Sequence, residues 1–465
     1  MTRPRLVEAL HSELPGAVYA PGDDEYADAT SPDNSSHEQA PSAVVRPRSA
    51  NQLASAVAVV SRLGGRVVVQ ATGHGAGEPV LGDDVLLDTS ALTDVTVDPT
   101  RRLAYVGAGA MWPAVQKAAA PHGILGLSGT SPTVGVAGYI FGGGVGWFVR
   151  KHGLAAATLR SVDYVDAEGR IRRAAPDASD PIDREALWAF RGGAPVGIAT
   201  AVEIDLVPVT DLWTGYLLWR ADDLPAVIAA WANATARVSA SVTSALSVLK
   251  LPPEGPFPDE LLGTPVVHLS YASPDGGAVL DGMRDPVTSA AQPVVDTTGP
   301  GDVASLSAIH LDPPAAVPAR GIGIWLGDNA TDAIAATFDA ARVGRRGGLN
   351  MIELRHTDCG PTDVDGALTS VPAPFLLHAV GAAADGDTRD LVDESLRAVG
   401  VASRAANTSR TAPSFRDGQL DAGESMSTSD FNRLRAVKIA LDPRRVFRFH
   451  RDPSRRTMEE HGLLQ

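Results

Sequence analysis

The spacing of apolar residues divides the chain into regions with different patterns. Between about residues 43 and 206, short β-branched runs such as "RVVVQA", "DVLLDTS" and "VDYVDA" alternate with helical stretches such as "SANQLASAVAVVSRLGG". This alternation predicts a layered α+β or α/β structure. Ser49 is expected to cap the quoted helix, and the pair Gly64–Gly65 is expected to end it.

From about residue 207 the apolar runs become longer. "LSVLKLP", "VVHLSYAS", "GIGIWLGD" and "NMIELRHTD" are separated by turns rich in proline and glycine and by alanine-rich helices. This pattern predicts an antiparallel sheet with helices on one face. Near residue 421 it changes again, and "FNRLRAVKIALDPRRVFRFHRD" predicts a basic helix that ends at Asp442-Pro443, followed by a short extended piece. The polar residues 21–42 are interpreted as a surface loop.

Length and composition are typical of a soluble protein with two connected domains. The 465 residues are 44% hydrophobic, and 40 basic against 55 acidic side chains give a formal charge of −15, which argues against a general affinity for nucleic acid or anionic membranes. We expect a cytoplasmic protein without a signal peptide or membrane span. Cys359 is the only cysteine, so an internal disulfide is excluded, and no metal site is predicted.

Glycine is concentrated in two stretches. "LSGTSPTVGVAGYIFGGGVGWFVRKHGL", residues 127–154, could leave backbone N–H groups open to a pyrophosphate or a planar ring, or could simply permit tight packing. "QATGHGAG" places His74 between two glycines. P-loop, H-E-x-x-H and G-x-S-x-G motifs are absent from the sequence, and the relaxed dinucleotide motif "GPGDVA" carries Pro300 where a backbone donor is needed.

The order of several stretches resembles the berberine-bridge-enzyme-like FAD-linked oxidases of the vanillyl-alcohol-oxidase and p-cresol-methylhydroxylase superfamily. These stretches are "QATGHGAG", "SGTSPTVGVAGYIFGGGVGWFVRKHGLA", "GIATAVEIDLVPV" and "RLRAVKIALDPRRVFRFHRD". The resemblance implies an α+β fold, with a two-part FAD-binding domain of the p-cresol-methylhydroxylase type and an inserted antiparallel-sheet substrate domain backed by helices. The implied segments are an FAD-binding domain at 1–206, a substrate domain at 207–420 and a C-terminal segment at 421–465 that returns to the FAD-binding domain.

The resemblance also implies the flavin contacts. His74 matches the histidine that this family bonds to the 8α-methyl group of the flavin, so a single covalent link is expected. Ser131 stands where some members carry a second, cysteine tether, which excludes the doubly tethered form. The remaining expected cofactor-binding residues are Thr72, Gly73, Gly75, Ala76, Ser128, Gly129, Val134, Gly135, Gly138, Gly143, Gly144, Gly146, Gly197, Ile198 and His450. Tyr139 is a further expected contact and catalytic candidate, with packing against the substrate domain as the alternative.

Three departures from the family pattern limit what the resemblance implies about the reaction. "RGGAPVG", residues 191–197, lacks an asparagine, Ala412 and Ser414 replace polar positions of a Tyr-x-Asn-Phe element, and His450 replaces the usual asparagine. The first hypothesis is an oxidase that transfers hydride from a small, natural-product-like alcohol, phenol or amine to FAD, with molecular oxygen as the partner that becomes hydrogen peroxide. The alternatives are a redox-neutral FAD-dependent cyclase or lyase and a sugar or oligosaccharide oxidase. The sequence predicts no particular oligomeric state.

The catalytic base is expected on the substrate-domain sheet. In "NMIELRHTD", strand alternation puts Glu353 and Arg355 on one face, and burial between the domains would raise the pKa of Glu353 and make it a general base. A Glu353–Arg355 ion pair on a solvated face is the alternative. His268, Tyr271 and Trp325 could line the pocket, although packing in the core is the default for such residues.

Overall fold

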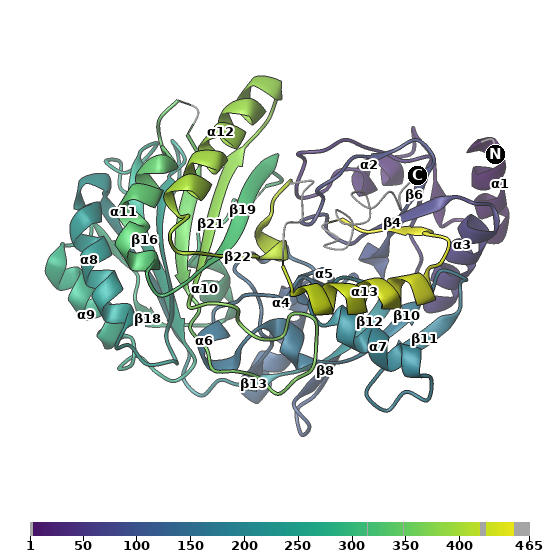
Figure 1. Ribbon diagram of the computed structural model, residues 1–465, viewed down its shortest axis with the longest axis horizontal. Coiled ribbons are helices and arrows are strands. Elements are labelled where there is room, and N and C mark those ends of the chain that lie inside the picture. The colour runs from purple at the N-terminus through teal and green to yellow at the C-terminus, as the bar shows by residue number, and fades with distance from the viewer. Residues whose placement is uncertain (1–2, 314, 347, 419–424, 451–465) are drawn as a thin grey trace.

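The computed structural model describes residues 3–313, 315–346, 348–418 and 425–450 (Figure 1). Segments from the two ends of the chain lie together in one half of the molecule, and the middle of the chain forms a large sheet in the other half. The predicted C-terminal segment 421–465 therefore falls partly outside the described residues. Its described part, residues 425–450, lies with the N-terminal half.

The first sheet of the N-terminal half is joined by the end of the chain. Its strand order is β1 (Val18–Tyr19), β3 (Ala43–Val45), β6 (Asp84–Asp88), β4 (Arg66–Gln70) and β23 (Phe447–Arg448). β23 pairs with β4 in parallel, and α1 (Arg3–Glu13) and α3 (Ala50–Arg62) bury their apolar side chains in the same core. The side chain of Ser49 caps α3 by accepting a hydrogen bond from the Gln52 N–H, and Gly64 follows the helix with φ of +68°, as predicted.

The second sheet of this half is antiparallel. Its order is β11 (Ile171–Ala174), β10 (Leu159–Val165), β12 (Ile198–Asp205), β8 (Leu103–Gly107) and β7 (Val95–Asp98). The largest buried core joins it to α4 (Trp112–Ala119), α5 (Val136–Phe141), α7 (Pro181–Phe190) and α13 (Thr428–Leu441). As predicted, α13 ends just before Asp442-Pro443. Shorter elements are α2 (Asp24–Ala29), α6 (Val149–His152), β2 (Gln39–Ala40), β5 (Val80–Leu81), β9 (Ile124–Leu125) and β13 (Val207–Pro208).

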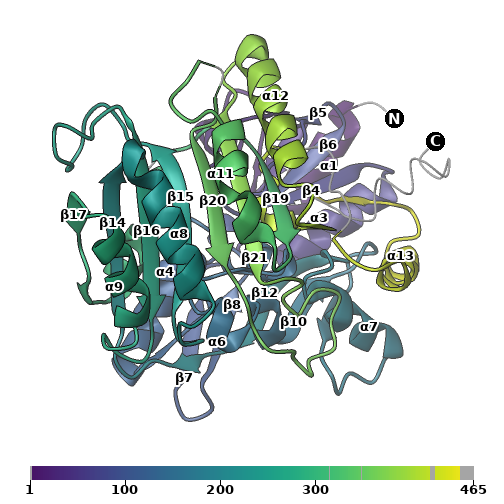
Figure 2. The same ribbon diagram turned by 60° about the vertical axis from the view of Figure 1, so that its left-hand side comes forward.

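The middle of the chain forms a nine-stranded antiparallel sheet. Eight strands follow the order β17, β14, β16, β15, β20, β21, β19, β22, and β18 pairs with β14. Their bounds are β14 (Trp213–Arg220), β15 (Thr243–Lys250), β16 (Pro265–Ser273), β17 (Val295–Asp296), β18 (Gly299–Pro300), β19 (Ala319–Leu326), β20 (Met351–His356), β21 (Phe375–Ala382) and β22 (Asn407–Thr411). Figure 2 shows α8 (Leu224–Thr235), α9 (Asp281–Ala290), α11 (Ala330–Ala340) and α12 (Gly386–Ala402) on one face, as predicted, while α10 (Val303–Ala308) packs with the other half.

Strand alternation determines which side chains lie on the face of this sheet that the helices do not cover. On β20, Ile352 and Leu354 are buried in the core beneath the helices. Glu353 and Arg355 therefore point to the opposite face, towards the half that contains the chain ends. Buried donors hold the halves together: the Arg150 guanidinium donates to the carbonyls of Ser239 and Val242 at 2.6 and 2.7 Å.

The interpretation of residues 21–42 as a surface loop is wrong in part. This segment contains α2 and β2, and Asn34 is only 3% exposed. The backbone of Asn34 forms a parallel β-bridge with Val317, beside the nine-stranded sheet. The segment thus forms an arm that crosses between the two halves.

Candidate functional site

A cavity of about 560 Å³ lies between the two halves. The half with the chain ends contributes the loop 69–76, much of the glycine-rich segment after residue 129, and residues 197–199 and 449–450. The sheet half contributes Lys250, Met351, His378 and Val380 from strands β15, β20 and β21, together with residues 413–415. The cavity is therefore assembled from segments that are hundreds of residues apart in sequence.

Most of the residues predicted to bind the cofactor line this cavity. They are Thr72, Gly73, His74, Gly75, Ala76, Gly129, Ser131, Val134, Gly135, Gly138, Gly197, Ile198 and His450. Gly75 and Gly138 have no atom within 4 Å of the position where a Cβ would stand, so each leaves open space that a side chain would fill. His450 accepts a long hydrogen bond from the Gly77 N–H at 3.4 Å, which brings the end of the described chain beside the His74 loop.

Four other predicted contacts lie outside the cavity lining: Ser128, Gly143, Gly144 and Gly146. Two of these glycines lie where a side chain would not fit. A Cβ on Gly144 would approach the Tyr139 ring within 2.6 Å, and one on Gly146 would approach the Ser128 carbonyl oxygen within 2.0 Å. Part of the glycine-rich sequence is therefore explained by close packing of the chain on itself, which was one of the two interpretations that the composition left open.

Tyr139 lines the cavity but is 9% exposed. Its ring packs edge-on against Trp112 with 5.6 Å between ring centroids, so its main partner belongs to the N-terminal half rather than to the sheet half. Burial raises the pKa of the phenol well above its ordinary value. The hydroxyl therefore stays protonated at neutral pH and can act as a hydrogen-bond donor, but not as a base.

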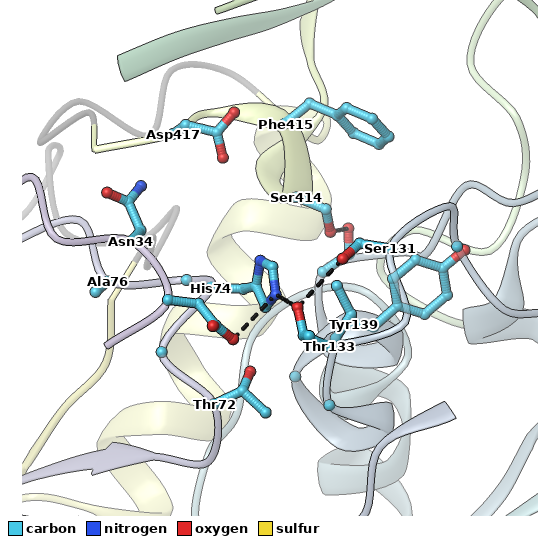
Figure 3. Close-up of a pocket in the computed structure, with 18 of the residues that line it drawn as sticks. Asn34, Thr72, His74, Ala76, Ser131, Thr133, Tyr139, Ser414, Phe415 and Asp417 are labelled. Carbon is cyan, nitrogen blue, oxygen red and sulfur yellow. Dashed lines mark hydrogen bonds and ion pairs between the residues drawn. The ribbon is translucent and has the colours of Figure 1, made fainter. Parts of the chain in front are cut away.

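His74 is held on one side by the N-terminal arm (Figure 3). Its Nε2 lies 3.1 Å from a carboxylate oxygen of Asp33 and 2.6 Å from the Thr133 hydroxyl. The preceding Gly73 has φ of +80°, and a Cβ there would overlap the side chain of Pro32 at 2.3 Å. Asp33 was not predicted from sequence because polar residues between helices are common in surface loops.

Glu353 does not have the environment that was predicted for it. The side chain is 1% exposed and lies outside the cavity lining, with one oxygen 2.9 Å from the Arg355 guanidinium and the other 2.6 Å from Nε2 of His310. Burial by itself raises the pKa of this carboxyl, but Arg355 and His310 outweigh it and bring the pKa well below the ordinary value. The predicted raised pKa is wrong, and the solvated-face alternative is wrong as well because both side chains are buried.

His310 joins this ion pair to a second carboxylate. Its Nδ1 lies 2.9 Å from Asp312, and both His310 and Asp312 line the cavity. Burial lowers the pKa of the imidazole, but the two carboxylates outweigh burial and raise it to about 10. Asp312, His310, Glu353 and Arg355 thus form a row of alternating charges with no net charge, in which Asp312 is partly exposed and the other three side chains are buried. We call it the charge quartet.

A histidine and a carboxylate also face the cavity from the sheet half. His378 on β21 lies directly across from Glu353 of β20 in register, and its Nε2 is 2.9 Å from Asp417. Phe415 packs edge-on against the His378 ring with 5.1 Å between centroids. His378, Phe415 and Asp417 all line the cavity, and none was predicted from sequence.

The three aromatic candidates considered for the pocket belong to the core. His268, Tyr271 and Trp325 lie outside the cavity lining and are at most 1% exposed. His268 bonds to the Ser247 hydroxyl and to the Ile309 carbonyl, and burial lowers its pKa to about 3. Packing in the core, the default expectation for these residues, is confirmed.

The charged side chains that line the cavity limit which groups could bind the phosphates of a nucleotide cofactor. Among the described residues that line it, Lys250 is the only lysine or arginine, while Asp33, Asp312 and Asp417 are acidic. The phosphates of FAD would therefore depend on backbone N–H groups, which loops such as 73–76 can supply. The glycine-lined wall and its open space at Gly75 and Gly138 fit a large planar cofactor.

The comparisons with known proteins show a domain match and a shared fold. Residues 41–175 match the FAD binding domain model, and residues 414–451 match the berberine and berberine-like model. The structure of Physcomitrella patens BBE-like 1 superimposes with a TM-score of 0.80 at 20% identity, covering 97% of this chain and 98% of that one. A 6-hydroxy-D-nicotine oxidase from Arthrobacter nicotinovorans superimposes with a TM-score of 0.77 at 21% identity, covering 93% and 96%. The chain therefore contains a match to an FAD binding domain and has the fold of these structures, which confirms the predicted fold class.

Curated sequences are similar to parts of the chain. Berberine bridge enzyme-like D-2 of Nicotiana tabacum is 35% identical over 193 residues, which are 39% of this chain and 32% of that protein. (R)-6-hydroxynicotine oxidase of Paenarthrobacter nicotinovorans is 30% identical over 186 residues, 39% and 40% of the two chains. The aligned regions span less than half the length of these relatives. Together with the two models, they show that parts of the chain are similar to berberine-bridge-enzyme-like FAD-linked proteins.

The structure also bears on the predicted absence of membrane spans. Among the described residues, every helix is too short or too polar to cross a bilayer.

Proposed function

We propose that the protein is an FAD-dependent oxidase that oxidises an alcohol, phenol or amine group of a small, natural-product-like molecule and passes the electrons to dioxygen, which forms hydrogen peroxide. The observation that carries this proposal is the cavity. It joins the His74 loop of the FAD-binding domain to the His378–Asp417 pair of the sheet. An oxidase of this kind needs such an arrangement, with a cofactor on one side and a proton acceptor on the other.

Each wall of the cavity has a separate task in this proposal. FAD, when bound, supplies the acceptor for the hydride. The chain supplies His74 as the single covalent anchor and backbone N–H groups around the phosphates. Leu249, Met351 and Val380 stand side by side on three neighbouring strands, and they offer an apolar floor for the carbon skeleton of the substrate.

His378 replaces Glu353 as the proposed base. The Asp417 carboxylate accepts a hydrogen bond from Nε2–H of His378, which fixes the tautomer and leaves Nδ1 as the proton acceptor. Glu353 is unsuited to this task because Arg355 and His310 occupy its two oxygens. The proton that leaves the substrate hydroxyl or amine would therefore go to His378.

The first experiment follows the absorption of the purified protein before and after acid precipitation, together with intact-chain mass spectrometry. We expect a yellow precipitate and an added FAD mass in the wild type, loss of both in His74→Ala, and retention of both in the exposed control His122→Ala. A His74→Ala variant with covalent flavin would refute the anchor.

The second experiment tests the reaction with a panel of alcohols, phenols and amines, mixed anaerobically with the protein. Bleaching of the flavin, followed by peroxide formation in air, is expected for an oxidase substrate. Conversion of a compound without bleaching would instead support the redox-neutral cyclase or lyase.

A further inference from the structure

We propose that Asp33 is a positioning residue that makes His74 competent to form its covalent bond to FAD. This inference rests on the proposed anchor at His74. It starts from the 3.1 Å distance between the Asp33 carboxylate and Nε2 of His74. An ionised carboxylate offers no proton, so this contact favours a proton on Nε2, which leaves the lone pair of the neutral imidazole on Nδ1. Asp33 thereby selects the tautomer in which Nδ1 is the nucleophile.

The hydroxyl groups beside His74 are compatible with this tautomer. Thr133 lies 2.6 Å from the same Nε2 and can accept from the N–H that Asp33 also accepts. The Thr133 hydroxyl proton can then be donated to Ser131, 3.2 Å away. The Nε2 proton and the Thr133 hydroxyl proton each have an acceptor in this arrangement, which is compatible with the role of Asp33.

Asp33 is fixed in place by the backbone on both sides of the cavity. Its N–H donates to the Thr72 carbonyl at 3.0 Å, and its carbonyl accepts from the Val317 N–H at 3.0 Å. Pro32 lies against Gly73, where only glycine leaves room. The His74 and Asp33 side chains are 37% and 28% exposed, so a cofactor entering the cavity can reach the imidazole.

The carboxylate has a second effect during the bond-forming step. The Nδ1 lone pair forms a bond to the 8α-methyl carbon of FAD, one C–H bond of that methyl group breaks, and the proton on Nε2 is given up. The two electrons and two protons go to dioxygen, which leaves as hydrogen peroxide. Positive charge builds on the imidazole as its lone pair is used, and the Asp33 carboxylate 3.1 Å away stabilises that charge.

The test measures the attachment of FAD separately from its binding. Wild type, Asp33→Asn, Asp33→Glu and His74→Ala are purified, supplied with excess FAD in air, and followed by intact mass. Glu25→Gln, on the exposed surface of α2 in the same arm, serves as the control. Non-covalent binding is followed by the flavin that acid releases.

We expect Asp33→Asn to bind FAD but to attach it roughly 10- to 100-fold more slowly, the range that loss of one charge-assisted hydrogen bond would give. Asp33→Glu should recover part of the rate, and Glu25→Gln should match the wild type. If the wild type carries covalent FAD and Asp33→Asn attaches FAD equally fast, the role of Asp33 is refuted while the anchor at His74 stands. A wild type without covalent flavin would overturn the anchor at His74, and the inference with it.

Discussion

The charge quartet should make the stability of the protein depend on alkaline pH. His310 has its pKa raised from the ordinary 6.5 to about 10 because Asp312 and Glu353 flank its imidazole. A raised folded-state pKa contributes stability that is fully present below the unfolded-state pKa and is lost as pH rises through the folded-state value. We therefore expect stability to fall between about pH 6.5 and about pH 10.

The size of this loss of stability follows from the contacts of His310 with Asp312 and Glu353. A shift from 6.5 to about 10 corresponds to about 5 kcal/mol, or about 1.4 kcal/mol per pH unit within the window. Breaking a buried ion pair by removing one partner costs about 3–5 kcal/mol, which agrees with this value. The lowered pKa of Glu353 arises in part from the same contact with His310. Its free energy is therefore not counted a second time.

The assay compares wild type with His310→Gln by guanidinium unfolding at several pH values between 7 and 9.5, followed by tryptophan fluorescence. Trp147 lies edge-on to His310 with 6.2 Å between ring centroids and reports on this region. His310→Gln should be less stable at pH 7 by about 3–5 kcal/mol and should lack the slope that His310 gives the wild type. His268→Gln is the control, because the pKa of His268 is lowered to about 3 and it stays neutral throughout the range. Equal slopes in wild type and His310→Gln would refute the reasoning.

Three further outcomes are expected. His378→Gln should reduce kcat at least about 100-fold with little change in KM, whereas His122→Gln should leave steady-state turnover unchanged. Gly138→Leu should lose FAD absorbance without a lower unfolding temperature because its side chain enters open cavity space, while Gly400→Leu, in open space on α12, should keep its flavin. Arg150→Met should lower the free energy of unfolding by about 2–4 kcal/mol, measured by guanidinium titration, because the buried Val242 carbonyl and the part-buried Ser239 carbonyl after α8 both lose their donor.

Sequence patterns predict the parts of this fold that depend on local spacing. The alternation in "NMIELRHTD" correctly places Glu353 and Arg355 on the face of β20 opposite the helix-covered core. Ser49 and the Asp442-Pro443 pair mark helix ends correctly because caps and proline act on neighbouring backbone groups.

The electrostatics of the site could not be predicted in this way. The pKa of Glu353 depends on His310, which comes from a segment 43 residues earlier and has no periodic relation to β20. Asp33 and His74 likewise meet only because the N-terminal arm folds back on the loop. Strand alternation states which face a side chain occupies, but it carries no information about what packs on that face.

The pairing of β23 with β4 has a consequence for the order of events during synthesis. Phe447 pairs with Val67, and His450 completes the cavity wall beside the His74 loop, so the site needs residues separated by about 380 positions. Long-range pairings of this kind form late because the intervening chain must be ordered first. A nascent chain that has not yet released residue 450 from the ribosome therefore lacks one wall of the cavity. We therefore expect flavin capture to follow the pairing of β23 with β4, and a chain truncated before residue 447 to remain colourless.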